Sequence, residues 1–359
     1  MASSLEATFS RAWLRRGPLA CALWPLSLLF RAIAGARRAA FGAGLAQSER
    51  LPVPVIVVGN IFIGGTGKTP LTIWLVEALR AAGLTPGVVS RGFGSADAAP
   101  RAVTAAATPA EVGDEPVLIA ARCACPVFVG RRRAAAGRAL LAAHPAVNVI
   151  VTDDGLQHYA LQRDIEIILF DGRGVGNGWT LPAGPLRETP ARRRDFTVVN
   201  TPELTPALAA AVAPRGASRE PCPPLRMALA GDVAERLADR TERLPLAELA
   251  RRAQPGQGGA LRISAAAGIG NPGRFFSMLR GAGLAPQEIP LPDHHDFLDR
   301  PFAAVEADII LVTEKDAVKC WQIEELRNDP RLWVVPVSAR IDGALADYIV
   351  EKLRGRTPA

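Results

Sequence analysis

The sequence predicts an α/β protein with a P-loop NTPase-like, doubly wound and mostly parallel sheet, a second smaller α/β lobe and an N-terminal membrane-associated helix. Three observations support this fold class. Short β-rich runs alternate with helical stretches, several runs end in polar residues, and a glycine-rich Gly-Lys-Thr loop separates the first run from the first helix. This alternation is typical of parallel sheets, which bind their ligands at the carboxyl ends of the strands.

The basic charge of the chain is concentrated near its N-terminus. The 359 residues are 49% hydrophobic and 21% charged, which is ordinary globular composition and excludes collagen-like, disordered and low-complexity classes. Of the net charge of +7, residues 1–50 carry +5, so the rest of the chain is nearly neutral. We therefore expect an anionic partner at the N-terminus, and no nucleic-acid partner.

The N-terminal segment contains an apolar run, Leu19–Phe30, with arginines on both sides. The run is shorter than the about 20 residues of a spanning helix, and Pro25 interrupts it. We expect a monotopic, interfacial helix in an anionic leaflet, within a first domain of residues 1–45 that includes a linker. The alternatives are a helix packed in the core and a cleaved signal peptide, although a nucleotide loop downstream argues against export.

The remaining elements follow from local patterns. Strands are expected over 53–58, 87–90, 127–129, 147–151, 165–170 and 196–199, with helices over 70–79 and after 131–133. Residues 202–224 are rich in Ala and Pro and predict a boundary. Beyond it, strands over 263–266 and 309–312 and a helix from Gly273 predict more α/β structure. We accordingly expect a P-loop core over 46–215 and a C-terminal α/β lobe over 216–359.

The loop Gly64–Thr69 reads Gly-Gly-Thr-Gly-Lys-Thr between a predicted strand and helix, which is the context of a phosphate loop. Backbone N–H groups at such a helix N-terminus surround phosphate oxygens. Lys68 would supply positive charge to the β- and γ-phosphates of ATP, and the Thr69 hydroxyl would hold Mg²⁺. Phe62 replaces the first glycine of the strict pattern. The predicted nucleotide-binding residues are Phe62, Ile63, Gly64, Gly65, Thr66, Gly67, Lys68 and Thr69.

Acidic residues follow in three places. Asp153 and Asp154 end a predicted strand, as the metal-binding acid of P-loop proteins does, although a solvated acid at a strand end would look the same. Asp114 and Glu115 lie on a predicted turn, and His294 lies in an Asp-His-His-Asp cluster. A carboxylate paired with a histidine suits a general base for an alcohol, but either cluster alone is as often structural.

Eight segments occur in a fixed order along the chain: VGNIFIGGTGKTP, SRGFG, GDEP, DDGLQH, LPAGPLRE, GIGNPGRFF, DHHDF and TEKDAVK. Together they resemble the tetraacyldisaccharide 4′-kinases, the lipid A 4′-kinases of Gram-negative bacteria, from about residue 10 to about residue 350. The resemblance implies transfer of the ATP γ-phosphate to the 4′-hydroxyl of tetraacyldisaccharide 1-phosphate, giving lipid IVA. It also implies an enzyme at the cytoplasmic face of the inner membrane.

The resemblance also implies roles for single residues. Asp114 and His294 would act together in taking the proton from the 4′-hydroxyl, and Lys68 and Asp154 complete the catalytic set. Asp153 would lie on the metal side with Thr69 and Glu115. Phe93 stands where relatives often have Tyr. The implied substrate-binding residues are Asn60, Arg91, Arg133, Gln157, His158 and Arg187.

Two other classes of function use the same loop. A membrane-recruited P-loop ATPase or GTPase acting as a switch would need Lys68 but no pair such as Asp114 and His294. A non-catalytic membrane adaptor would bind nucleotide and form no phosphorylated product. The residues imply no obligate protein partner.

Overall fold

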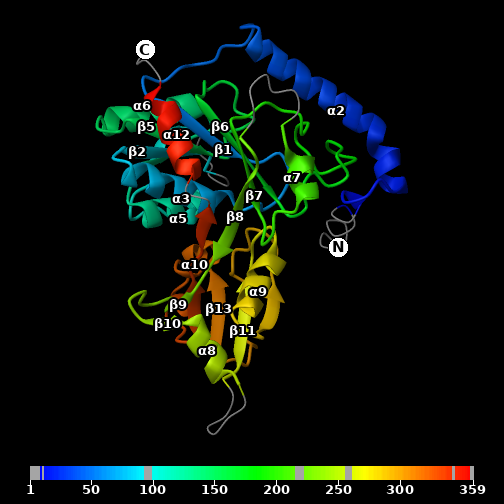
Figure 1. Ribbon diagram of the computed structural model, residues 1–359. Coiled ribbons are helices and arrows are strands. Elements are labelled where there is room, and N and C mark those ends of the chain that lie inside the picture. The colour runs from blue at the N-terminus through cyan, green and yellow to red at the C-terminus, as the bar shows by residue number, and fades with distance from the viewer. Residues whose placement is uncertain are drawn as a thin grey trace.

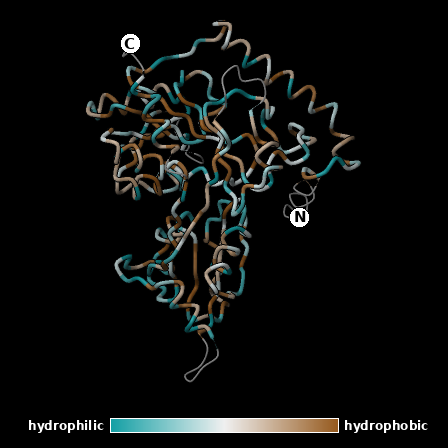
Figure 2. The backbone as a smooth tube through the Cα atoms, viewed as in Figure 1, coloured by the Kyte–Doolittle hydropathy of each residue, from teal (hydrophilic) through white to brown (hydrophobic). Residues whose placement is uncertain are grey.

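The computed structural model describes residues 9, 12–92, 99–214, 222–254, 261–341 and 344–355. They form two α/β lobes, each built on one sheet, and a long helix, α2 (Pro18–Gly42), that lies along the outside of the larger lobe (Figure 1). Hydrophobic strands run through the centre of both lobes (Figure 2). The fold class predicted from the sequence is confirmed.

The larger lobe is built on a nine-stranded sheet with the order β15-β8-β7-β6-β1-β5-β2-β4-β3. The pairs between β8 and β4 are parallel, and the two edge strands β15 and β3 pair antiparallel. The strands are β1 (Val55–Gly59), β2 (Pro86–Ser90), β3 (Arg101–Ala102), β4 (Val127–Val129), β5 (Val149–Asp153), β6 (Ile165–Asp171), β7 (Phe196–Asn200), β8 (Leu225–Ala230) and β15 (Ser338–Ile341).

Helices cover both faces of this sheet, which explains why β1, β2, β4, β5 and β7 are buried along their whole length. One hydrophobic cluster joins the sheet to α3, α5 and α12, and a second joins it to α6 and α7. The helices are α3 (Lys68–Ala81), α4 (Pro109–Val112), α5 (Asp114–Cys123), α6 (Arg133–Ala143), α7 (Pro206–Val212) and α12 (Ala344–Arg354).

The smaller lobe is built on a six-stranded sheet with the order β10-β9-β14-β13-β11-β12. Helices α8 and α9 pack in one hydrophobic cluster, and residues of α10 and α11 pack in another. The elements are β9 (Val233–Arg236), β10 (Arg243–Pro245), α8 (Leu246–Arg252), β11 (Ile263–Ala267), α9 (Pro272–Gly281), β12 (Gln287–Pro290), β13 (Ile309–Thr313), α10 (Glu314–Cys320), α11 (Glu324–Arg327) and β14 (Leu332–Val335).

The structure differs from the local predictions in three ways. The stretch 202–224, expected to be aperiodic, contains α7, which Thr205 caps by accepting from Leu208 N. Asp114, expected on a turn, is the first residue of α5. Strands β8 and β15 and helix α12 lie in the expected C-terminal lobe by sequence, yet they pack on the nine-stranded sheet. The division of the chain into 1–45, 46–215 and 216–359 stays a prediction.

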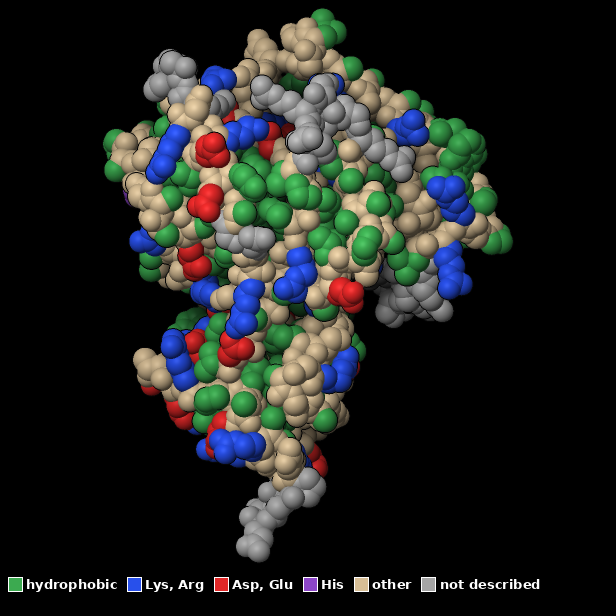
Figure 3. Space-filling model, in the orientation of Figure 1, with side chains coloured by type: hydrophobic (Ala, Val, Ile, Leu, Met, Phe, Trp, Pro, Cys, Tyr) green, Lys and Arg blue, Asp and Glu red, His purple; other side chains and the backbone are tan. Residues whose placement is uncertain are grey.

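Helix α2 is longer than the apolar run that predicted it, and Pro25 lies inside it. Its 25 residues are long and apolar enough to cross a membrane, a test that N-terminal signal sequences also pass. Only Ala20 and Ser27 of this helix are buried, while Leu26, Leu29 and Ile33 are 55–62% exposed. Hydrophobic and basic side chains gather on the side of the molecule where α2 lies (Figure 3). A helix packed in the core would instead bury its apolar face.

Candidate active site

The predicted phosphate loop connects β1 to α3, and its shape depends on glycine. Gly64 and Gly67 have positive φ angles of 95° and 98°. A Cβ on Gly67 would lie 2.5 Å from Asn200 Nδ2, which leaves no space for a side chain. Asn60 Nδ2 donates to the carbonyl oxygens of Phe62 and Gly64, at 2.6 and 3.2 Å. The loop therefore folds around a buried asparagine and ends at the N-terminus of α3, where helical N–H groups lack intrahelical partners.

Lys68 joins this loop to the acids at the end of β5. Its Nζ donates to Asn60 Oδ1 at 3.2 Å and lies 3.8 Å from Asp154 Oδ1. The parallel pairing of β1 with β5 sets Val58 beside Asp153, so the two strand ends meet at one edge of the sheet. The structure thus brings together the lysine and the aspartates that the sequence separates by more than 80 residues.

Asp153 is completely buried. Its Oδ1 accepts from Thr72 Oγ1 at 3.1 Å, and its Oδ2 has no hydrogen-bond partner among the residues that the structure describes. Burial, and secondarily the Glu115 carboxylate, raise the pKa of Asp153 to about 7, against the opposing charge of Lys68. An unpaired buried oxygen is costly, so this side chain is suited to receive a cation.

The residues fit a magnesium ion held largely by phosphate oxygens. Across the described ranges, no group of three or more His, Cys, Asp or Glu side chains converges on one point. Mg²⁺ is usually bound by one or two carboxylates together with substrate phosphates and water. Asp153 and the buried Thr69 lie in the positions expected for that arrangement, and Glu115 is near enough to affect the pKa of Asp153.

Asp114 and His294 meet across the two lobes. His294 Nδ1 lies 3.0 Å from Asp114 Oδ2, with Asp114 at the start of α5 and His294 in the loop after β12. Burial would raise the pKa of Asp114, but the hydrogen bond from His294 and the charge of Lys315 outweigh it, so the pKa is lowered. The hydrogen bond to Asp114 raises the pKa of His294 in spite of partial burial.

Two lysines of α10, which sequence reasoning missed, surround this pair. Lys315 Nζ lies 3.3 Å from Glu115, 3.7 Å from Asp293 and 3.8 Å from Asp114. Lys319 Nζ lies 3.9 Å from Asp114 and 3.3 Å from Asp316. Burial opposes the charge of Lys315, but the carboxylates outweigh it and raise its pKa. The segment TEKDAVK held the only signal for these residues.

The smaller lobe also contacts the phosphate loop directly. A Cβ on Gly270 would lie 2.7 Å from the backbone nitrogen of Gly65. Arg274 Nη1 donates to Thr66 O at 3.2 Å, and its Nη2 donates to Asp171 Oδ2 at 2.9 Å. The sequence marked this contact only as the segment GIGNPGRFF, without a role.

Arginines gather beside Asp154. Arg187 Nη1 lies 3.5 Å from Asp154 Oδ1, and the buried Arg133 donates from Nη2 to Asp154 O at 3.5 Å. Burial lowers the pKa of Arg133 to about 10. The Arg133 backbone N–H donates to His158 Nε2 at 3.2 Å. Burial, and then the charge of Arg133, lower the pKa of His158 to about 4, so His158 is neutral at pH 7.

Other predicted substrate residues lie differently. Gln157 donates to Glu188 Oε1 at 3.0 Å, which ties it to a buried network rather than to Asp154. Asn60 is fully buried inside the phosphate loop. Arg91 is exposed after β2, near enough for its charge to affect the pKa of Arg133. Phe93 lies outside the described residues.

Comparisons with known proteins identify the family of this chain. The family model LpxK, described as tetraacyldisaccharide-1-P 4′-kinase, matches residues 19–354. Proteins named tetraacyldisaccharide 4′-kinase from Janthinobacterium sp. (strain Marseille) and Herminiimonas arsenicoxydans are 59% and 58% identical to this chain, over 99% of it and at least 98% of each relative. One from Dechloromonas aromatica is 47% identical over 96% of both chains.

A solved structure is also similar. The crystal structure of "apo" form LpxK from Aquifex aeolicus in complex with ATP aligns with a TM-score of 0.73 at 27% identity, covering 93% of this chain and 99% of that one. The family model spans most of the chain, and the relatives match almost its whole length. This chain therefore belongs to the tetraacyldisaccharide-1-phosphate 4′-kinase family.

Proposed function

We propose that the chain transfers the γ-phosphate of ATP to the 4′-hydroxyl of tetraacyldisaccharide 1-phosphate in lipid A biosynthesis, with Asp114 and His294 receiving the hydroxyl proton. The observation that carries the proposed mechanism is the 3.0 Å contact between His294 Nδ1 and Asp114 Oδ2, which joins the two lobes. Family membership makes the protein an ATP-dependent lipid kinase.

The phosphates of ATP are assigned to the loop Phe62–Thr69. Its backbone N–H groups and the N-terminus of α3 would bind phosphate oxygens, and Lys68 would leave Asp154 to contact the β- and γ-phosphates. Asp154 holds Lys68 at 3.8 Å before ATP binds, and it orients Arg187, whose Nη1 lies 3.5 Å from Asp154 Oδ1. Because Asn60 is buried and holds both the loop and Lys68, we assign it a positioning role rather than contact with the lipid.

Thr69, Asp153 and Glu115 are the residues that would hold Mg²⁺. When bound, the ion neutralises phosphate charge and orients the phosphates for in-line transfer. The unpaired Oδ2 of Asp153 supports this assignment, since it is buried beside the phosphate loop without a donor.

The acceptor hydroxyl is assigned to His294. Its side chain is 36% exposed whereas that of Asp114 is 7% exposed, so a substrate reaches the imidazole first. With Nδ1–H donating to Asp114, Nε2 is the atom that takes the proton from the 4′-hydroxyl oxygen. That oxygen bonds to the γ-phosphorus as the bond from the γ-phosphorus to the β–γ bridging oxygen breaks and ADP leaves. The Asp114 carboxylate stabilises the imidazolium that results, and Lys315 and Lys319 keep this carboxylate in place.

The anionic acceptor is assigned to the basic residues beside Asp154. Arg133 and Arg187 present guanidinium groups there, and Arg91 lies near Arg133 at the end of β2. Nε2 of neutral His158 accepts from the Arg133 N–H, so Nδ1–H is left to donate a hydrogen bond to a sugar hydroxyl. Gln157 donates to Glu188, the residue that follows Arg187 in the chain. We therefore assign Gln157 a positioning role, in which it fixes the segment that carries Arg187.

We assign α2 to the cytoplasmic leaflet of the inner membrane, among anionic lipids. Each CH₂ of an acyl chain withdrawn from a bilayer costs about 0.8 kcal/mol, so the enzyme must work where its lipid lies. The ATP supply places the site on the cytoplasmic face. We expect neither a nucleic-acid partner nor an obligate protein partner.

The test is an ATP-dependent assay on tetraacyldisaccharide 1-phosphate with mass spectrometry of the lipid. Wild-type enzyme should add one phosphate at the 4′ position, and Asp114→Ala should form little product. ATP or GTP hydrolysis that is indifferent to the lipid would favour the alternative, a membrane-recruited switch, and would overturn the proposal.

A further inference from the structure

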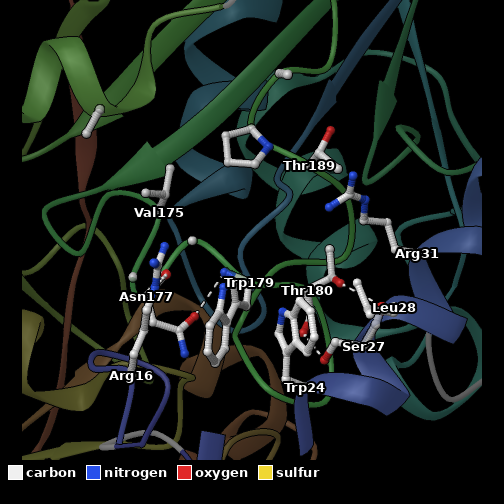
Figure 4. Close-up of a pocket in the computed structure, with 15 residues that line it drawn as sticks. Arg16, Trp24, Ser27, Leu28, Arg31, Val175, Asn177, Trp179, Thr180 and Thr189 are labelled. Carbon is white, nitrogen blue, oxygen red and sulfur yellow. Dashed lines mark hydrogen bonds between the residues drawn. The ribbon is translucent and has the colours of Figure 1, made fainter. Parts of the chain in front are cut away.

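A cavity lies away from the site described above, between α2 and the segment that follows β6 (Figure 4). Its volume of about 530 Å³ is within the range of about 300–1,000 Å³ that is usual for small-molecule sites. Neither the phosphate loop nor Asp114 or His294 contributes to its lining. Its lining includes Arg16, Trp24, Leu28, Arg31, Trp179 and Ala191.

Buried hydrogen bonds join α2 to the loop after β6 beside this cavity. Ser27 Oγ donates to Thr180 O and accepts from Ala183 N, both at 2.8 Å. Thr180 Oγ1 donates to Ser27 O at 3.2 Å. These buried bonds fix one face of α2 to the loop, so the cavity beside them keeps a defined shape.

Two tryptophans and two arginines are among the residues that line the cavity. The rings of Trp24 and Trp179 lie 6.3 Å apart, and the Arg16 guanidinium lies over Trp179 at 5.1 Å (Figure 4). Arg16 Nε donates to Asn177 O at 3.1 Å. No Asp or Glu lines the cavity, and in the described part of the chain none forms an ion pair with Arg16 or Arg31. The lining therefore combines cationic side chains with apolar and aromatic ones and contains no acid.

The cavity lies on the element assigned to the membrane. Trp24, Leu28 and Arg31 are spaced for one face of α2, while the exposed Leu26, Leu29 and Ile33 are spaced for another. Tryptophan and arginine are the residues that settle at headgroup depth, where the leaflet presents phosphates. A phospholipid that passes around α2 from the bilayer into the cavity would meet arginine and tryptophan side chains beside apolar ones.

We propose that this cavity binds one anionic glycerophospholipid of the bilayer. Its headgroup phosphate lies between Arg16 and Arg31, and its glycerol and first acyl carbons pack on Trp24, Leu28 and Trp179. The proposal rests on the assignment of α2 as a membrane anchor and adds a discrete site to it. Guanidinium groups bind phosphate with charge-assisted hydrogen bonds, which a diffuse attraction to the surface does not form.

The test measures partitioning of the full-length enzyme onto phosphatidylcholine vesicles with and without phosphatidylglycerol. Arg31→Gln should weaken the phosphatidylglycerol-dependent binding by roughly twentyfold or more. Arg38→Gln removes the same charge two turns further along α2, outside the cavity, and should lose only about fivefold, as expected for one charge near a surface.

A variant that fills the cavity distinguishes binding inside it from general attraction between arginines and an anionic surface. Ala191→Trp keeps every charge but occupies the cavity, so it should lose the phosphatidylglycerol dependence as Arg31→Gln does. Ala143→Trp, on α6 and outside the lining, is its matched control and should behave as wild type. All four variants should keep wild-type kinase activity in detergent micelles free of phospholipid, which also shows that they fold.

Three results would overturn the proposal, each for a different reason. If wild type binds neither vesicle, the anchor assignment itself is wrong. If wild type prefers phosphatidylglycerol but Arg31→Gln and Ala191→Trp match their controls, α2 is an anchor without a headgroup site. If Arg31→Gln raises the KM for the disaccharide in phospholipid-free micelles, the cavity belongs to the kinase substrate.

Discussion

Asp153→Asn should stabilise the protein in the absence of nucleotide and Mg²⁺ while abolishing kinase activity. Asp153 is completely buried, its Oδ2 has no hydrogen-bond partner in the described part of the chain, and burial raises its pKa from 3.8 to about 7. Asparagine keeps an oxygen that can accept from Thr72 Oγ1 and carries no charge to bury. The variant removes one of the oxygens that Mg²⁺ needs.

The magnitude follows from the two pKa values. Raising the pKa from 3.8 to about 7 destabilises the folded protein by about 4 kcal/mol at pH 8, where both states are ionised, and by about 2 kcal/mol at pH 5. The folded state binds more protons than the unfolded state between these values. Wild-type stability therefore declines as pH rises from about 4 to about 7 and then levels, whereas the variant lacks this decline.

The assay is thermal unfolding of wild type and Asp153→Asn at pH 5 and pH 8, without nucleotide or Mg²⁺. For a domain of this size about 2 °C corresponds to 1 kcal/mol, so the advantage in Tm should be about 5 °C greater at pH 8. Asp154→Asn is the control, because its side chain is 35% exposed and pairs with Lys68. Its charge raises the pKa of Asp153 less than burial does, so this variant should show a much smaller gain. An advantage that is equal at the two pH values would refute the reasoning.

Four further predictions test the kinase site and the anchor. Lys68→Ala should lower kcat/KM for ATP by about 10² or more, because a preorganised charge on the phosphates is lost; near-normal values would remove Lys68 from the phosphate site. Asp114→Asn should lower kcat by about 10² and move the acidic limb of the pH–kcat profile to lower pH, since the hydrogen bond to Asp114 raises the pKa of His294; a change in KM alone would make Asp114 a binding residue. Gly270→Ala places a Cβ 2.7 Å from Gly65 N and should raise the KM for ATP, while Gly281→Ala, with no atom within 4 Å, should not; equal KM values would show that this contact does not support the phosphate loop. Deletion of residues 1–40 should release the enzyme from vesicles that contain phosphatidylglycerol, and unchanged sedimentation would contradict the anchor.

Much of the larger lobe could be predicted because its signals are local. Buried parallel strands such as β1 and β5 are continuous apolar runs, and a Gly-Lys-Thr loop between a strand and a helix has few other uses. The same locality explains the errors. Strand β8, which lies next to the edge strand β15, is partly exposed and lacks a clean pattern. Asp114 looked like a turn residue because Gly113 precedes it and Pro116 follows.

The sequence by itself determined the family, the fold class and the positions of Lys68, Asp153 and Asp154, because these depend on residue order within short segments. Only the tertiary structure decided which segments meet. The contact between Asp114 and His294 spans 180 residues. The lysines of α10 near Asp114 come from the smaller lobe, as His294 does. Such contacts depend on how the two lobes pack against each other, and the local hydrophobic pattern of the sequence carries no information about that packing. The same holds for the cavity beside α2. Its lining comes from Arg16, from α2 and from residues more than 140 positions later in the chain, and it forms only when Ser27 joins the helix to that segment.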